Sequence, residues 1–253
     1  MKKMSLILGD IHSCISMANS LLNEFQESID EVVYVGDYFD NWNDTVEDAK
    51  NTAYWLKKIV NTPNHICCLG NHDLAYMFPN NGQLNCPGWT EKKSEAINEI
   101  LSQEDWSKFK LAYKTQGFWI SHAGITKEVF EHPILGLTDE VIEEKCKKAL
   151  IHAKANIYSE VLAAGYARGG RQRVGGITWA HWSSEFKPIA GLKQIVGHTF
   201  NKKYRSTYIP NKKYKEGENH CIDCGGKYSG MIDNGIFKIV VRGEDGLFSI
   251  VDV

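Results

Sequence analysis

Short apolar runs alternate with longer amphipathic segments through the first part of the chain. The runs at 5–8, 32–35 and 66–69 have the length and composition of buried strands. The segments between them, at 16–25 and 45–60, repeat apolar residues at the spacing of one helix face. This β-α-β-α-β order predicts parallel strands joined by right-handed helical crossovers.

Helical patterns dominate the middle of the chain. Short helices are expected at 93–101 and 105–110. The longest amphipathic pattern covers 138–164, which we expect to form one helix that ends at Gly165. With its flanking residues, this helix would form an insert at about 127–165 that lies over the functional site.

Strand-like runs return in the last part of the chain. Further strands are expected at 117–120, 194–196, 220–223, 236–241 and 247–251. The charged stretch 201–217 is expected to form a loop. Two groups of strands with peripheral helices predict an α/β fold, a four-layer α/β/β/α sandwich of two mixed sheets flanked by helices. We expect residues 1–253 to form a single domain that carries the helical insert.

Composition and charge narrow the range of functions. The 253 residues are 43% hydrophobic and 24% charged, as in ordinary globular proteins. The formal charge of −2 gives no general attraction to nucleic acids or anionic membranes, so neither is expected as a stable partner. No apolar stretch approaches the roughly 20 residues that cross a bilayer. The seven cysteines are irregularly spaced, which indicates a reducing compartment. The amino-terminal apolar run is too short for a signal peptide, so we expect a cytoplasmic location.

Each of the three early strands leads into a glycine followed by polar residues. These segments read Gly-Asp-Ile-His at 9–12, Gly-Asp-Tyr-Phe-Asp at 36–40 and Gly-Asn-His-Asp at 70–73. Glycine permits a sharp turn where a strand stops, and parallel strands end at the same edge of a sheet. We therefore expect one cluster at that edge, formed by Asp10, His12, Asp37 and Asn71 with His72 beside it. Such oxygen and nitrogen donors suit Mn²⁺, Fe or Zn²⁺ better than Ca²⁺.

Two later histidine segments complete a recognisable series. They read Ser121-His122-Ala-Gly124 and Val196-Gly197-His198-Thr199. With them, the chain resembles the calcineurin-like metallophosphoesterases, nearest their branch of Ser/Thr phosphoprotein phosphatases and symmetrical diadenosine-tetraphosphate hydrolases. The family pattern of D-x-H, G-D-x-x-D, G-N-H-[DE], an isolated histidine and G-H occurs here in that order. The resemblance covers roughly residues 4–124 and 192–241.

The resemblance implies two divalent metal ions, with Mn²⁺ expected and Fe, Zn²⁺ or Mg²⁺ as alternatives. The first ion would bind Asp10, His12 and Asp37. The second would bind Asp37, Asn71, His122 and His198. Attack of a metal-bound hydroxide on phosphorus would make the protein a metal-dependent hydrolase of phosphate esters.

The resemblance also implies two catalytic residues outside the ligand set. His72 would protonate the leaving oxygen as a general acid. Asp40 would hydrogen-bond the His72 imidazole and orient it. Asp73, the last residue of that motif, is expected to be structural.

The chain departs from the phosphoprotein phosphatases where phosphate-binding arginines are expected. Asn41 stands in place of the first arginine and Ala180 in place of the second. A glycine-rich loop just upstream offers replacements, so we expect the substrate to contact Asn41 together with Arg168, Arg171 and Arg173.

Several substrate classes remain open. A phosphate monoester on a protein or a small molecule is the leading expectation. The alternatives are a dinucleoside polyphosphate, a cyclic nucleotide or another phosphodiester, and a non-catalytic scaffold of the same fold. Phe200 occupies the position where many nucleases of the superfamily carry another histidine, which disfavours a nuclease. The physiological substrate, native metal, oligomeric state and role of the insert also remain open.

Overall fold

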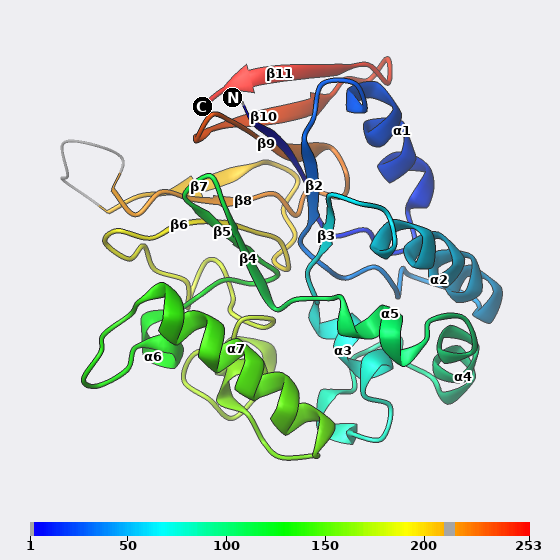
Figure 1. Cartoon of the computed structure of the whole chain (residues 1–253), viewed down its shortest axis with the longest axis vertical. Coiled ribbons are helices and arrows are strands. Elements are labelled where there is room, and N and C mark those ends of the chain that lie inside the picture. Colours follow the sequence, from blue (N-terminus) through cyan, green and yellow to red (C-terminus); the bar gives the residue numbers. More distant parts are fainter. Residues whose placement is uncertain (1–2, 210–215) are drawn as a thin grey trace.

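The computed structural model describes residues 3–209 and 216–253, whose strands form two sheets (Figure 1). The strands of the first sheet are β1 (Met4–Leu8), β2 (Glu31–Tyr34), β3 (His65–Cys67), β9 (Tyr228–Asp233), β10 (Ile236–Arg242) and β11 (Phe248–Asp252). Those of the second are β4 (Ala112–Thr115), β5 (Phe118–Ser121), β6 (Lys193–Val196), β7 (Arg205–Thr207) and β8 (Asn219–Cys221). The orders are β11-β10-β9-β1-β2-β3 and β4-β5-β6-β8-β7.

Helices and short helical turns connect these strands. The α-helices are α1 (Ile15–Phe25), α2 (Val46–Val60), α3 (Asn71–Met77), α4 (Glu91–Ile100), α5 (Gln103–Ser107), α6 (Lys127–Phe130) and α7 (Asp139–Lys154). The 3₁₀ turns are η1 (Gly82–Leu84), η2 (Glu160–Leu162) and η3 (Tyr166–Arg168). No helix within the described ranges is long and apolar enough to cross a membrane.

Both sheets combine parallel and antiparallel neighbours. In the first sheet β1, β2 and β3 are parallel, whereas β9, β10 and β11 join them antiparallel. In the second sheet β5, β6 and β8 are parallel, and the edge strands β4 and β7 are antiparallel. The parallel strands β1, β2 and β3 lie side by side at one end of the first sheet, and β5, β6 and β8 form the middle of the second. The turns that follow the parallel strands of one sheet therefore lie at the same side of it.

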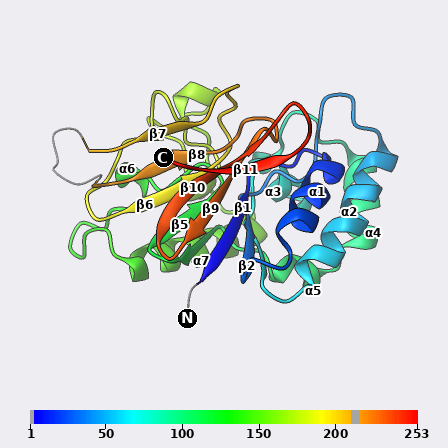
Figure 2. The same ribbon diagram turned by 90° about the horizontal axis from the view of Figure 1, so that it is seen from above.

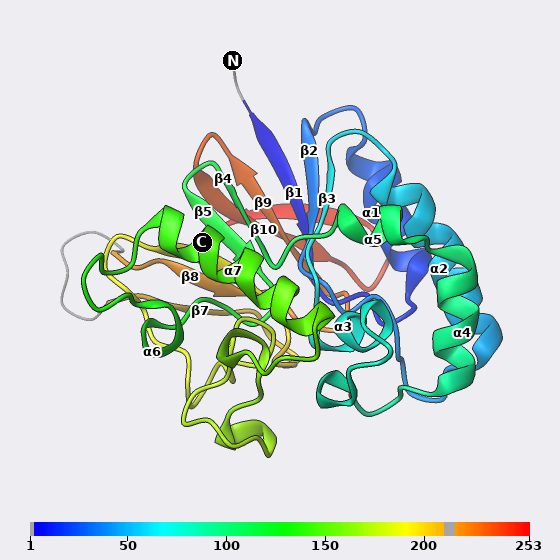
Figure 3. The same cartoon turned by 60° about the horizontal axis from the view of Figure 1, so that its bottom comes forward.

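Alternate residues of the strands face different layers. Ile7 and Phe118, from different sheets, belong to one buried cluster between the sheets. Leu6 instead packs in the cluster that includes the inner faces of α1 and α2. On the outer face of the second sheet, the indole Nε1 of Trp119 donates to Asp139 of α7 at 3.0 Å. Figures 2 and 3 show α1, α2 and α4 on one side of the molecule and α7 on the other. The predicted four-layer α/β/β/α sandwich is confirmed.

A capping box begins α2, the crossover between β2 and β3. The backbone N–H of Asp48 donates to Thr45 Oγ1 at 3.2 Å, and the Thr45 N–H donates to Asp48 Oδ2 at 2.9 Å. Such a cap stabilises a helix by about 1 kcal/mol. The buried Ala53 and Leu56 then hold the crossover against the sheet.

The expectation of one helix over 138–164 is wrong. α7 ends at Lys154, and Asn156 adopts the left-handed conformation with φ of 56°. Asparagine tolerates this conformation, which interrupts the helical hydrogen bonds. Ile157 continues the apolar spacing but is 52% exposed, and Val161 is buried from η2 instead. The insert is therefore α6, α7 and a turn-rich return segment.

Two smaller differences concern the second sheet. The expected loop at 201–217 includes the strand β7, which pairs antiparallel with β8, and its residues 210–215 lie outside the described ranges. The sequence pattern also missed β4, whose residues read Ala-Tyr-Lys-Thr. That residues 1–253 form a single domain stays a prediction.

Candidate metal centre

The turns after five strands meet at one place between the two sheets. The turn after β1 carries Asp10 and His12, the turn after β2 carries Asp37 and Asp40, and β3 leads to Asn71 and His72 at the start of α3. In the other sheet His122 follows β5, and His198 follows β6. Contacts between the sheets join the two sets, since the backbone N–H of His198 donates to both carboxylate oxygens of Asp10, at 3.1 and 3.0 Å.

Asp10, His12 and Asp37 form the first group of potential ligands. Their donor atoms all lie within 4.8 Å of one another. The His12 Nδ1 atom lies 2.8 Å from the carbonyl oxygen of Phe39, which can only accept a hydrogen bond. His12 Nδ1 therefore carries a proton, and Nε2, the nitrogen left for a metal ion, lies 3.7 Å from Asp37 Oδ2.

Asp37, His122 and His198 form a second group, which shares Asp37 with the first. The His122 Nε2 atom lies 3.2 Å from Asp37 Oδ2 and 3.1 Å from His198 Nδ1. The side-chain oxygen of Asn71 lies 3.0 Å from the same nitrogen. Asp37, Asn71 and His122 are buried, so these donor atoms are fixed by the surrounding structure.

The electrostatics of the cluster favour a bound cation. Burial and the neighbouring Asp223 carboxylate raise the pKa of Asp10 well above its ordinary value. Burial opposes ionisation of Asp37, but His122 and His72 hold the pKa of Asp37 well below its ordinary value. Burial also disfavours a charged His122, yet Asp37 and Asp10 raise its pKa to about 9. Several buried carboxylates with imidazole and amide donors form a set that fits a divalent first-row metal ion.

Two glycines, Gly70 and Gly197, leave room for the carboxylates of Asp37 and Asp10 beside the backbone. A Cβ atom at Gly70 would lie 2.0 Å from Asp37 Oδ1, and one at Gly197 would lie 1.9 Å from Asp10 Oδ1. Neither position can carry a side chain without displacing a candidate ligand. Asp37 and His198 adopt left-handed backbone conformations, with φ of 50° and 66°. Strained backbone of this kind is concentrated at functional sites.

His72 and Asp40 form a hydrogen-bonded pair at the edge of the cluster. His72 Nδ1 lies 2.9 Å from Asp40 Oδ2. Tyr76 and Lys93 donate to Asp40 Oδ1, at 2.6 and 3.0 Å. Burial opposes a charged His72, but Asp37 and the bond to Asp40 raise its pKa. Burial likewise opposes a charged Asp40, but its hydrogen bonds to His72 and Tyr76 lower its pKa.

The residues expected to contact substrate are dispersed. Arg168 reaches the cluster, because its Nη2 lies 3.2 Å from the carbonyl oxygen of His198. Arg171 lines a cavity beside the insert, and the Arg173 side chain is exposed. Asn41 lies in the turn after Asp40, where its backbone N–H donates to Asp44 Oδ2 at 2.9 Å.

Several residues near the cluster were not predicted from the sequence. Lys93 is only 6% exposed and binds Asp40 from the first turn of α4. Asp223 is also buried and follows β8, but no glycine precedes it to signal a functional turn. The expected structural role of Asp73 has a visible basis in its carboxylate, which accepts backbone N–H groups of Gly70 and Asp37 at 2.8 Å each.

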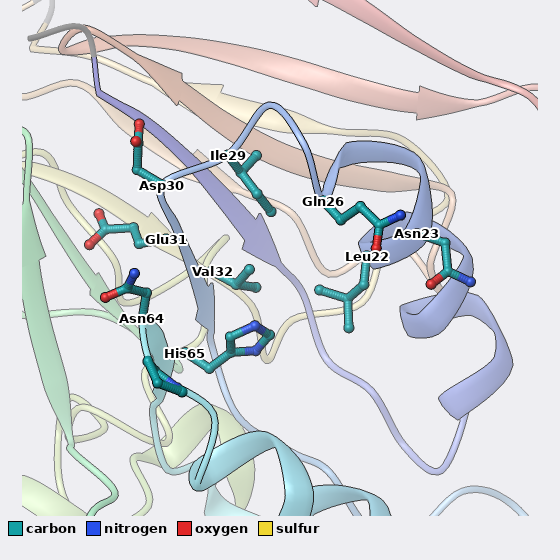
Figure 4. A pocket seen from close by; sticks show the side chains of 10 residues that line it. Leu22, Asn23, Gln26, Ile29, Asp30, Glu31, Val32, Asn64 and His65 are labelled. Carbon is teal, nitrogen blue, oxygen red and sulfur yellow. The ribbon is translucent and has the colours of Figure 1, made fainter.

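A separate cavity of about 270 Å³ lies at the opposite edge of the first sheet. Residues at the start of β2 and β3 line it, and Figure 4 shows Leu22 of α1 and Gln26, which follows α1, opposite His65. The candidate metal centre lies beyond the carboxyl ends of the same strands. This cavity is therefore distinct from the centre.

The family model described as calcineurin-like phosphoesterase matches residues 5–200. No curated protein matches the chain.

Three solved structures are similar in fold. A protein provisionally assigned as a diadenosine tetraphosphatase is 17% identical with a TM-score of 0.47, over 98% of this chain and 93% of that one. A Saccharomyces cerevisiae serine/threonine phosphatase with similarity to human phosphatase PP5 is 13% identical with a TM-score of 0.47, over 99% and 80%. A Sphaerobacter thermophilus metallophosphoesterase is 13% identical with a TM-score of 0.44, over 99% and 88%. The family match covers most of the chain, so the protein belongs to the calcineurin-like phosphoesterases and is a hydrolase.

Proposed function

We propose that the protein is a dinuclear metal-dependent phosphatase that hydrolyses phosphate monoesters of proteins or small molecules. The observation that carries this proposal is the position of Asp37, whose carboxylate belongs to both groups of potential ligands. A shared carboxylate is suited to hold two cations about 3.5–4 Å apart, as two-metal hydrolysis requires.

The two groups divide the ligands between two cations. Asp10, His12 and Asp37 would hold one cation, and Asp37, Asn71, His122 and His198 the other. When bound, such a pair of cations would lower the pKa of a bound water molecule to about 7. It would also neutralise charge on the phosphoryl oxygens. Mn²⁺ is our leading candidate, with Fe, Zn²⁺ or Mg²⁺ as alternatives, because the donors combine oxygen and imidazole nitrogen.

His72 supplies the proton to the leaving oxygen in this proposal. Its Nδ1 donates to Asp40, so Nε2 is the atom available to a substrate. Asp40 keeps the imidazole oriented and favours its protonated form. Tyr76 and Lys93 fix Asp40 in turn, at 2.6 and 3.0 Å.

Arg168 is the arginine best placed to bind the phosphate. It lies against the backbone of His198 and belongs to a loop that contacts the cluster from the second sheet. A guanidinium there would recognise phosphoryl oxygens through charge-assisted hydrogen bonds. Asn41, beside Asp40, would contact the substrate from the first sheet.

Ala180 favours a second candidate function, hydrolysis of a dinucleoside polyphosphate or another phosphodiester. The residue is 1% exposed, and its backbone N–H donates to Gly176 at 2.9 Å. This position lacks the arginine that the phosphoprotein phosphatases use, so recognition of a terminal phosphate depends on fewer cations.

A cytoplasmic location fits the described cysteines, all of which are free.

The proposal is tested by hydrolysis assays with Mn²⁺ and then with EDTA. The substrates are p-nitrophenyl phosphate, bis-p-nitrophenyl phosphate, a phosphoserine peptide and diadenosine tetraphosphate. Mn²⁺-dependent turnover that favours the monoesters supports the phosphatase. Preference for the bis-ester or the dinucleotide supports the second candidate, and no turnover with any divalent metal contradicts both.

A further inference from the structure

A cavity of about 430 Å³ lies between the end of α7, the turn η1 and the glycine-rich loop. Figures 1 and 3 show the carboxyl end of α7 beside α3, which η1 follows. The Asn81 side chain joins these parts by donating to the carbonyl oxygen of Ala153 at 3.0 Å. The volume is within the range of small-molecule sites, about 300–1,000 Å³.

The cavity walls combine apolar surface with one cation. Tyr158 and Ile157 line it and are 56% and 52% exposed. Leu84 and Leu162 contribute buried apolar surface. Arg171 lines the cavity too, and none of the described carboxylates forms an ion pair with it. An aromatic ligand that carries negative charge would satisfy both features.

Two segments of the wall continue directly to the candidate metal centre. Two residues after Leu84, the Cys86 sulfur accepts a hydrogen bond from Asn71 Nδ2 at 3.3 Å. Three residues before Arg171, the Arg168 guanidinium lies 3.2 Å from the His198 carbonyl. Two residues of chain span at most about 7 Å and three at most about 11 Å. The cavity wall is therefore joined by short stretches of chain to two side chains that contact candidate metal ligands.

We propose that this cavity binds the base of a nucleotide whose phosphate is the group hydrolysed. The inference rests on the proposed function and specifies its substrate class. The base stacks on the ring of Tyr158. The side chains of Gln83 and Ser159 offer polar groups to the edge of the base. Arg171 and Arg168 lie along the path of the sugar and the phosphate.

The construction of the cavity favours a nucleotide over a phosphorylated peptide. Its lining residues come from α7, η1, η2 and loops, and none belongs to a strand. An extended peptide would therefore find no free strand edge for backbone pairing. A nucleotide instead needs one compact, partly apolar site for its ring, which is what the walls supply.

The test compares adenosine 5′-monophosphate with ribose 5-phosphate on the Mn²⁺-loaded enzyme. Both release the same ribose 5′-oxygen, so their difference in kcat/KM reports the base alone. We expect adenosine 5′-monophosphate to be favoured about tenfold or more. In parallel, isothermal titration with adenosine, which has no phosphate to lose, reads the cavity without turnover.

Substitutions assign the preference to the cavity. Ala163→Phe fills the cavity, and Tyr158→Ala removes the stacking face from an exposed position that folding does not need. Both substitutions should bring the ratio of kcat/KM for adenosine 5′-monophosphate to that for ribose 5-phosphate close to one. Both should also weaken adenosine binding about tenfold. Ala155→Phe is the matched control, because Ala155 is exposed next to the cavity without lining it. It should keep both properties.

The outcomes separate this inference from the proposed function. Equal hydrolysis of the two phosphates, without adenosine binding, overturns the cavity assignment and leaves the phosphatase intact. Adenosine binding that depends on Tyr158 and Ala163, without hydrolysis of either phosphate, supports the cavity assignment and contradicts the phosphatase. A preference that the cavity variants leave unchanged also overturns the assignment.

Discussion

The Nδ1 atom of His72 lies 2.9 Å from Oδ2 of Asp40, while Tyr76 and Lys93 bind the other oxygen of the same carboxylate. Asp40 therefore has little freedom to rotate away from the imidazole. The pair orients His72 so that one nitrogen binds protein and the other is available to substrate.

Replacement of His72 should slow the enzyme according to the leaving group. His72→Asn is expected to lower kcat for phenyl phosphate about 100-fold, because phenolate needs a proton as it leaves. The effect on 2,4-dinitrophenyl phosphate should be only a few-fold, because its leaving group is stable as an anion. Steady-state kinetics with both esters measure the difference. An equal loss for both would contradict the role of general acid.

Asp40→Asn tests the orienting role of the carboxylate. The variant retains His72 but loses the charge that favours its protonated form, so kcat for phenyl phosphate should fall about tenfold. The dependence on the leaving group should resemble that of His72→Asn. If Asp40→Asn lowers kcat equally for both esters, Asp40 only maintains the local structure.

Arg168 should matter for phosphate binding. Arg168→Ala is expected to raise KM for p-nitrophenyl phosphate about tenfold, because it removes charge-assisted hydrogen bonds to the phosphoryl oxygens. Arg168→Lys should restore part of the loss, since a lysine keeps the charge without the planar fork. Arg242→Ala, at an exposed position on the distant strand β10, is the control and should behave as wild type. Unchanged KM in Arg168→Ala would contradict this assignment.

Glu31 lies at the side of the first sheet remote from the metal centre, and its contacts lead to a prediction of how the free energy of unfolding depends on pH. Its Oε1 accepts hydrogen bonds from Ser5 at 2.6 Å and from Thr115 at 2.5 Å, and Lys3 lies 3.1 Å from Oε2. Burial opposes its charge, but these contacts hold the pKa of Glu31 below its ordinary value of 4.5. Because Ser5 and Thr115 belong to different sheets, this carboxylate ties the two sheets together.

Glu31→Gln should lower the free energy of unfolding by about 2 kcal/mol at pH 7. The depressed pKa stabilises the folded state above pH 4.5, and this contribution is lost as the pH falls through the folded-state pKa. The difference between variant and wild type should therefore shrink below pH 4.5 in urea titrations. Glu24→Gln, on the exposed face of α1, is the control. A difference that stays constant with pH would contradict the assignment.

Local patterns predicted the fold and the turns that follow its strands. Apolar runs followed by glycine located the turns of Asp10, Asp37 and Asn71, because a buried strand and a sharp turn each leave a local mark in the sequence. The end of α7 left no such mark. Ile157 kept the helical spacing, and the left-handed Asn156 was not distinguishable from other exposed helical residues.

Contacts made only by tertiary packing were not predictable. Lys93 looks like any charged residue at the start of a helix, and its burial against Asp40 depends on how α4 packs. The glycine-rich loop could have placed its arginines in many ways, and the structure separates Arg168 at the cluster from Arg171 at the cavity. Such positions follow from the packed fold rather than from spacing.

The most direct test of the dinuclear centre is the metal content of the protein. Wild-type protein and Asp37→Ala are loaded with Mn²⁺, desalted and measured by mass spectrometry of the metal, with Asp245→Ala at an exposed loop as control. Because Asp37 belongs to both groups of ligands, we expect about two ions per chain in wild type and control, and almost none in Asp37→Ala. One ion or none in wild type, or two ions retained in Asp37→Ala, would contradict a centre bridged by Asp37.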